Sequence, residues 1–423
     1  MTRTTRLIMA GALALATGLA PLGATGIQES NQEEDTGGSQ EPAGAPAEAA
    51  GAAEAARAPA GAASVAAFKE VGARIPEVGR RARGFQAFRT GDLTLIEVTR
   101  PWQNADAPDT LRYLLYPRGE QAPQVEGVDL AVGVPTRSIV TTSTTFLPHL
   151  DALGHLDRLI AVDSVAYAYN GQVHDMAADG ELTEVGSGPG VDVERLIALD
   201  PDLIMVNSYG GDWDLQPALE EAGLPVVVSG DWVENEPLGR AEWLLFTALL
   251  FDDLEAGLET FERIEAEYER LSALTDGVDR RPTILVNAPY QGDWTVPGGE
   301  SYAARFIRDA GGRYVWGEDQ STGSLFLDVE SVYAEAGEAD IWINPGVWTS
   351  LDQGAAEDER FTAFEAFENA QVYNNNRRMG PGGGNDYFES GALHPERILA
   401  DLIHIFHPDL LPERELFYYR KLE

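Results

Sequence analysis

VDVERL at residues 191–196 leads into the apolar run DLIMV, and the same phrase returns as LDVESV at residues 327–332, leading into DIWI. In each copy an aspartate stands two positions before a glutamate, which is the order of a helix N-cap followed by an acidic first turn. The apolar run that follows has the residue types of a buried strand. The two glutamates, Glu194 and Glu330, lie 136 positions apart (330 − 194). An internal repeat of this kind predicts two similar α/β lobes, each with one carboxylate at the start of a helix.

The composition limits the class of protein. With 423 residues and 44% hydrophobic content, the chain can bury a core large enough for two domains of ordinary size. Its 30 basic and 69 acidic residues give a net charge of −39, which disfavours nucleic acid and anionic membranes as direct partners and favours cationic patches on other proteins. Cysteine is absent from the sequence, so it offers no disulfide, no thiolate chemistry and no cysteine for lipid attachment.

The N-terminal residues have the layout of an export signal. Residues 1–25 contain Arg3 and Arg6, then an apolar run, then small residues, which predicts a secretory signal peptide and a periplasmic or secreted protein after its cleavage. An uncleaved leader that acts as an anchor is the alternative. Residues 26–67 are rich in Ala, Gly, Pro and Glu with almost no large apolar side chain, so burial cannot offset the entropy of ordering them. We predict a disordered linker there.

The rest of the sequence divides into four parts. Strand-like segments and turn residues predict a β-rich N-terminal extension over residues 68–136. Short strands rich in Val, Ile and Leu then alternate with helical stretches, which indicates parallel βαβ winding in an N-lobe (137–236) and a C-lobe (276–423). Between them, residues 237–275 have helical spacing with a soft break at Asp252-Asp253. The predicted fold class is α/β, with two Rossmann-like lobes of parallel sheet joined by a long rigid helix. The predicted strands are 93–98 and 111–116 in the extension, 138–140, 159–162, 203–206 and 225–228 in the N-lobe, and 283–286, 340–343 and 371–373 in the C-lobe.

Several short motifs near the end of the chain carry a family resemblance. They are VPGG at 296–299, FIRDAGG at 306–312, QVY at 371–373, PERILADL at 395–402 and HPDLLP at 407–412. Together with the repeated phrase and the long central helix, they resemble the helical-backbone solute-binding proteins of ABC importers over roughly residues 137–412. The β-rich extension and the ending ELFYY at 415–419 resemble a variant of that family with iron-related binding functions.

The resemblance implies a function. The family takes up ferric siderophores, haem and cobalamin, so it implies an exported binding protein that closes two lobes on such a ligand and delivers it to a permease. It also implies that Glu194 and Glu330 dock into arginine pockets on the two permease subunits, which suits the bidentate pairing of carboxylate with guanidinium. The alternative is that both acids only favour the helix dipole next to the caps Asp192 and Asp328. We expect a monomer with no cofactor.

The ligand is expected beyond the carboxyl ends of the parallel strands, where the two lobes face each other. Aromatic rings there would stack on a planar or catechol-bearing ligand, and arginines would bind an anionic chelate. The alternatives are that the rings pack the lobes and that the arginines neutralise Asp386 and Glu389. The candidate ligand-binding residues are Thr144, Tyr169, Tyr209 and Trp232 in the N-lobe, and Tyr290, Trp294, Trp348, Arg377 and Arg378 in the C-lobe.

Other chemistries find little support in the sequence. Of six histidines only His404 and His407 would share a helix face, so no metal site is predicted. The glycine run at 382–384 lacks the Lys-Ser/Thr ending of a phosphate loop, and we predict a mobile loop at the cleft edge. No G-x-S-x-G elbow occurs, so no catalytic residue is assigned. An exported hydrolase with paired carboxylates, from Asp231, Asp293 and Asp386, remains an alternative, as does a surface-attached scavenger.

Overall fold

The computed structural model describes residues 64–211 and 214–423. The predicted signal peptide and most of the predicted linker (26–67) lie outside the described residues. The last four linker positions are ordered: the hydroxyl of Ser64 caps helix α2 (Val65–Val71) by accepting a hydrogen bond from the N–H of Ala67 at 3.3 Å. Phe68 is buried, because the helix packs against the β-rich extension. No helix in this part of the chain has the length and apolar character to span a membrane.

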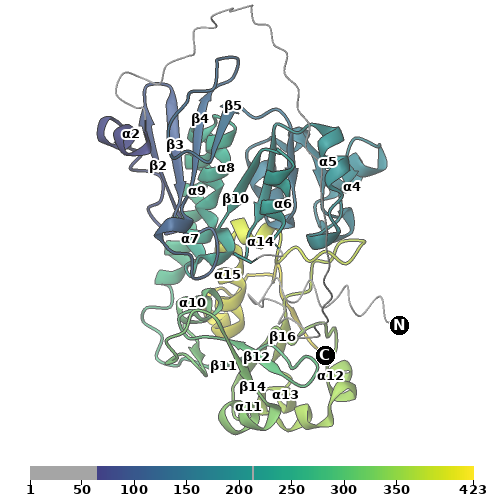
Figure 1. The fold of residues 1–423 in the computed structure, drawn as a ribbon. Coiled ribbons are helices and arrows are strands. Elements are labelled where there is room, and N and C mark those ends of the chain that lie inside the picture. The colour runs from purple at the N-terminus through teal and green to yellow at the C-terminus, as the bar shows by residue number, and fades with distance from the viewer. Residues whose placement is uncertain (1–63, 212–213) are drawn as a thin grey trace, which may run out of the picture.

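The N-lobe, at the upper right of Figure 1, is built on a parallel sheet whose strand order is β10-β9-β6-β7-β8. Strands β6, β9 and β10 are buried on both faces, as a sheet covered by helices requires. The strands are β6 (Ile139–Thr141), β7 (Leu159–Val162), β8 (Thr183–Glu184), β9 (Leu203–Asn207) and β10 (Val226–Ser229). The helices are α3 (Leu147–Ala152), α4 (Gly171–Ala178), α5 (Val193–Leu199) and α6 (Leu215–Glu221).

The C-lobe repeats this arrangement in the order β13-β11-β15-β16-β17, in which only β17 is antiparallel to its neighbour. Strands β12 and β14 form a separate antiparallel pair. The strands are β11 (Thr283–Val286), β12 (Trp294–Pro297), β13 (Arg313–Tyr314), β14 (Ser324–Leu327), β15 (Ile341–Ile343), β16 (Val372–Asn374) and β17 (Arg420–Lys421). The helices are α10 (Tyr302–Asp309), α11 (Val329–Ala336), α12 (Leu351–Glu357), α13 (Glu365–Glu368), α14 (Ser390–Leu393) and α15 (Pro395–Phe406).

The repeated phrase has equivalent places in the two sheets. Helices α5 and α11 each lead into the strand that lies between two parallel neighbours, β9 in the order β10-β9-β6 and β15 in the order β16-β15-β11. The aspartate before each strand also has the same role. Asp202 accepts a hydrogen bond from the backbone N–H of Arg137 at 2.8 Å, and Asp340 accepts one from Thr283 at 2.7 Å. The predicted α/β fold with two similar lobes is confirmed.

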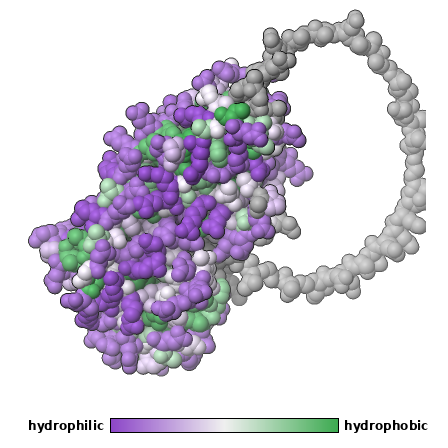
Figure 2. Space-filling view, turned by 90° about the vertical axis from the view of Figure 1, so that its left-hand side faces the viewer, coloured by the Kyte–Doolittle hydropathy of each residue, from purple (hydrophilic) through white to green (hydrophobic). Residues whose placement is uncertain are grey.

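The β-rich extension is a five-stranded sheet that packs on the helices between the lobes. Its order is β1-β2-β3-β4-β5, with β4 and β5 parallel and the other pairs antiparallel. The rings of Phe85 and Trp243 lie 4.6 Å apart, and those of Tyr113 and Phe246 lie 6.2 Å apart. The surface seen in Figure 2 is mostly hydrophilic with small apolar patches, as the net charge predicts. The strands are β1 (Ala73–Arg74), β2 (Phe85–Thr90), β3 (Leu93–Val98), β4 (Leu111–Pro117) and β5 (Leu130–Val134).

A buried glutamate fastens the extension to those helices. The side chain of Glu242 is 0% exposed, and its carboxylate accepts hydrogen bonds from the backbone N–H groups of Arg80, Arg81 and Ala82 at 2.6–2.9 Å. Glu234 binds the next two N–H groups along the same segment. Each buried carboxylate is thus stabilised by hydrogen bonds from backbone N–H groups that have no other partner in the turn.

The segment predicted as one helix over residues 237–275 is three helices: α7 (Pro237–Ala241), α8 (Trp243–Leu250) and α9 (Leu254–Ala273). The chain breaks at Asp252, which has a left-handed φ of 54°, and α9 then packs along α8. A Cβ added at Gly257 would lie 2.7 Å from the Cβ of Ala248, so a glycine is needed for this close approach. The rigid helix between the lobes is therefore α9, about 30 Å long at 1.5 Å per residue.

A second buried carboxylate holds the C-terminal tail. Asp401 on α15 is 0% exposed and accepts hydrogen bonds from the backbone N–H groups of Phe417 and Tyr418, at 2.9 and 2.7 Å. Arg414 donates to the same carboxylate at 2.8 Å. The tail can then place β17 beside β16.

We expect the substitution Asp401→Asn to destabilise the C-lobe by about 3 kcal/mol, because an amide N–H₂ would face backbone donors and Arg414 would lose its counter-ion. Thermal unfolding followed by circular dichroism should show a midpoint lowered by several degrees. The matched control is Asp409→Asn, an exposed aspartate in the turn after α15. An unchanged midpoint for Asp401→Asn would contradict the assigned role.

Candidate functional site

The carboxyl ends of the central parallel strands carry small polar side chains in both lobes. In the C-lobe three strands end at or just before an asparagine, and Asn287 and Asn344 adopt left-handed φ angles of 65° and 59°. These ends face the region between the lobes, where a ligand is expected in this class of fold. The residues at the strand ends are Thr141, Asn207 and Ser229 in the N-lobe, and Asn287, Asn344 and Asn374 in the C-lobe.

Helix α14 partly fills the region between the two sheets. It belongs to the C-lobe, yet it contacts α3 and the short helix η2 (Thr144–Phe146) of the N-lobe as well as α7. The space directly beyond the N-lobe strands is therefore occupied by the chain itself. The open cavity at the junction of the lobes lies to one side of this contact.

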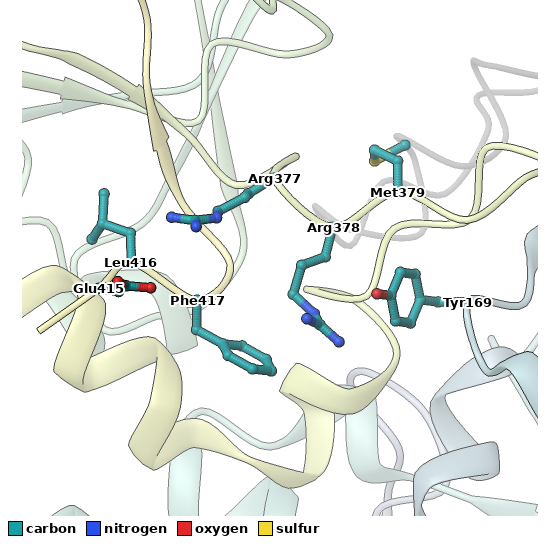
Figure 3. Close-up of a pocket in the computed structure, with 7 residues that line it drawn as sticks. All are labelled: Tyr169, Arg377, Arg378, Met379, Glu415, Leu416 and Phe417. Atoms are coloured by element: carbon teal, nitrogen blue, oxygen red, sulfur yellow. The ribbon is translucent and has the colours of Figure 1, made fainter.

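That cavity has a volume of about 450 Å³. Tyr169 lines it from the N-lobe, and the other lining residues come from the segment after β16 and from the C-terminal tail (Figure 3). Three of the nine predicted ligand-binding residues, Tyr169, Arg377 and Arg378, meet there. The remaining lining residues are Met379, Glu415, Leu416 and Phe417.

The two arginines have different surroundings. Arg378 donates to buried Asp386 at 2.5 Å, and its guanidinium lies over the rings of Phe417 and Tyr169, at 4.2 and 4.8 Å from their centroids. Arg378 thus pairs with Asp386, one of the two carboxylates that the alternative named for the arginines. Arg377 is exposed to the cavity and forms no ion pair with any of the residues that the structure describes. Its guanidinium is the positive charge available to a ligand.

The prediction that Trp294 and Trp348 contact ligand is wrong, because both rings lie in the C-lobe core. They are 0% and 2% exposed. Trp294 stacks on Trp342 at 5.4 Å, and Trp348 packs against Phe361 at 5.3 Å. Their indole N–H groups donate to the carbonyl of residue 286 and the carboxylate of residue 357. Position after a strand does not show which way a ring points.

Four other predicted residues do not line the cavity. Thr144 starts η2, under α14. Tyr209 and Trp232 form a ring pair at 5.0 Å in the N-lobe, and burial, with the nearby carboxylates of residues 214 and 231, raises the pKa of Tyr209 to about 12. Tyr290 is an exposed turn residue whose hydroxyl accepts a hydrogen bond from the neighbouring Gln291.

The repeated glutamates are exposed in the first turns of their helices, each after an aspartate cap. Figure 1 shows these helices far apart, α5 at the upper right and α11 at the bottom. Glu330 pairs with Arg360 at 2.6 Å. An exposed apolar side chain stands three positions after each glutamate, Ile197 on α5 and Tyr333 on α11.

For Glu389 the sequence alone indicates no role beyond that of a carboxylate that the two arginines could neutralise. It is 3% exposed, and its carboxylate accepts hydrogen bonds from the N-lobe N–H groups of Tyr169 and Asn170 at 2.6 and 2.9 Å. Burial raises the pKa of Glu389 to about 7, and the nearby charge of Asp386 adds to the shift. No local pattern indicates a contact with residues about 220 positions away.

The described histidines contact the protein itself. His404 and His407 lie within hydrogen-bonding distance of backbone carbonyls, those of Leu411 and Gly311. Among residues 64–211 and 214–423, no group of three or more His, Asp or Glu side chains is arranged to hold a metal ion.

Comparison with known proteins agrees with this architecture. The model of the periplasmic binding protein family matches residues 139–377, more than half of the chain. An uncharacterized lipoprotein of Methanocaldococcus jannaschii is 24% identical over 300 residues, which are 69% of this chain and 70% of the relative.

Two solved structures are similar in fold. The periplasmic heme-binding protein RhuT from Roseiflexus sp. RS-1 has a TM-score of 0.52 and 19% identity, covering 65% of this chain and 99% of that one. An ABC-type Fe3+-hydroxamate transport system protein from Saccharomonospora viridis has a TM-score of 0.50 and 18% identity, covering 65% and 94%. Because the family model matches more than half of the chain, the chain belongs to the periplasmic binding protein family.

Proposed function

We propose that the chain is the exported substrate-binding component of an ABC importer, and that it captures an anionic iron-siderophore-type chelate in the cavity between its lobes. The observation that carries this proposal is the unpaired guanidinium of Arg377 in a cavity lined by the rings of Tyr169 and Phe417. In this model of function the protein binds and delivers without making or breaking bonds. The predicted signal peptide and the lipoprotein relative support export.

The charge balance of the chain supports an anionic ligand. Acidic residues outnumber basic ones by 69 to 30, so most arginines have carboxylates within reach, as Arg378 has in Asp386. A cavity arginine without such a partner can form bidentate hydrogen bonds with a carboxylate or catecholate of a ligand. The rings of Tyr169 and Phe417, which hold Arg378 between them, add apolar surface to the lining.

Haem is the second candidate, because a planar dianion suits the same arginine and rings and because RhuT, which has this fold, is a haem-binding protein. A volume of about 450 Å³ is within the range of small-molecule sites. Cobalamin, which is much larger, would require the lobes to separate further. A hydrolase is the weakest alternative, since Asp231 and Asp386 are each buried and paired with an arginine.

We further propose that Glu194 and Glu330 contact the two permease subunits. Both carboxylates are exposed on helices that the duplication made equivalent, and each has an apolar neighbour, Ile197 or Tyr333, beside it. An exposed charge of this kind sets register and association rate more than affinity. The pairing of Glu330 with Arg360 is exposed to solvent and can be exchanged for a partner's arginine.

Replacing Arg377 by Gln should weaken binding of an anionic ligand by about 10- to 100-fold, because a charge-assisted hydrogen bond is lost. The affinity is measured by titrating the purified protein with a ferric siderophore, haem and cobalamin while following tryptophan fluorescence. The matched control is Arg158→Gln, an arginine on the surface of the N-lobe. The ligand class is wrong if none of the three quenches fluorescence, and the role of Arg377 is wrong if its variant binds normally.

The double substitution Glu194→Ala and Glu330→Ala should abolish uptake while leaving ligand affinity unchanged, because neither residue lines the cavity. Uptake of radiolabelled ligand by cells that carry the importer measures the first effect, and titration measures the second. Glu221→Ala with Glu368→Ala, an exposed glutamate pair with one member in each lobe, is the control. Persistent uptake in the first variant would exclude the docking role.

A further inference from the structure

In the glycine loop, residues 380–384, three glycines lie against the N-lobe with no room for a side chain: Gly380, Gly382 and Gly384. A Cβ added at Gly384 would lie 2.2 Å from the carbonyl oxygen of Tyr167, and one at Gly382 would lie 2.4 Å from that of Ala166. These neighbours are backbone atoms, which cannot turn aside as a long side chain can. Only Gly383 in the middle of this run has a left-handed φ, 99°. Glycine is therefore needed in this loop mainly because the N-lobe backbone lies so close, and less because of the loop's own backbone conformation.

Glu389, just after this loop, makes a second contact with the same part of the N-lobe. Both of its oxygens are used, one by the N–H of Tyr169 and the other by the N–H of Asn170. A buried carboxylate is stable only when donors surround it. The contact therefore holds only while the two lobes stand in this relative position.

Tyr169 joins these contacts to the cavity. It is the residue that the N-lobe contributes to the cavity lining, and its ring lies against Arg378, which Asp386 holds in place. Figure 3 shows the ring of Tyr169 and that of Phe417 on opposite sides of Arg378. Any movement of residues 166–170 away from the glycine loop would remove this wall.

We propose that the glycine loop and Glu389 form a latch between the lobes, and that bound ligand is released when this latch opens and the Tyr169 wall moves away. Glu389 is a positioning residue, since it acts through the backbone of Tyr169. The role in ligand exchange rests on the proposed function, but the latch itself is a contact that exists without ligand.

The latch is a reversible contact. When the lobes separate, the Glu389 carboxylate and its two donors exchange their hydrogen bonds for bonds to water, and such opening belongs to the timescale of domain motions. Helices α7 and α9 pack on α15, so we expect opening to be a small rotation about that side of the molecule.

The absence of cysteine from the sequence allows two spin labels to be placed specifically, by Glu181→Cys in the N-lobe and Glu413→Cys in the C-lobe, both exposed. Pulsed electron paramagnetic resonance of the ligand-free protein should give a single, short distance between the two labels. Adding Gly384→Ala should shift most of the population to longer distances, and Glu389→Gln should do so in part. The control is Gly171→Ala, beside the latched segment, where an added Cβ meets no atom within 4 Å.

Circular dichroism checks that each variant is folded, and Glu389→Gln keeps the side-chain volume should Gly384→Ala fail to fold. An unchanged distance distribution in the folded variants would overturn the latch. Stopped-flow release of a ligand found by titration should be about tenfold faster in Glu389→Gln, which corresponds to 1.4 kcal/mol. If the distances shift and none of the three ligands binds, the proposed function is wrong and the latch is supported. If a ligand binds and the distances do not change, the proposed function is supported and the latch is wrong.

Discussion

A carboxylate that leaves water must find hydrogen-bond donors, and in this chain the donors are backbone N–H groups of distant segments. Glu242 binds the segment that enters the β-rich extension, Asp401 binds the C-terminal tail, and Glu389 binds the N-lobe. Each carboxylate fixes a segment that has no other regular structure to hold it. The acidic residues of this chain therefore do more than charge its surface: three of them also hold distant segments together inside the fold.

These fastenings explain how the candidate site is assembled. Asp401 places the tail so that Phe417 lines the cavity, and Glu389 places Tyr169 on the other side of Arg378. The aromatic faces thus come from segments that are almost 250 positions apart in the sequence. Of the two arginines that line the cavity, Arg378 lies between these rings and pairs with Asp386, so Arg377 is the one left without an ion pair.

The sequence predicts the regular part of the molecule well, because strands and caps are local. The strands around Leu159 and Thr283 begin and end where they were expected, and the aspartate caps of both repeated helices are present. The break at Asp252 was underestimated, since the left-handed residue and the close contact at Gly257 depend on how α8 packs against α9.

The site was predicted less well, for a related reason. Trp294 and Tyr169 both follow from the rule that ligands bind beyond strand ends, yet one ring points into the core and the other lines the cavity. Periodicity does not give that direction. The hydrogen-bond partners of Glu389 cannot be predicted from the sequence either, because they depend on how the two lobes meet.

The position of the cavity relative to the repeated segments has an evolutionary consequence. The duplicated segments form the framework, whereas the cavity is lined mostly by residues 377–379 and 415–417, which lie outside the repeat. Mutation can therefore alter the cargo of such a protein while leaving its two inherited halves intact.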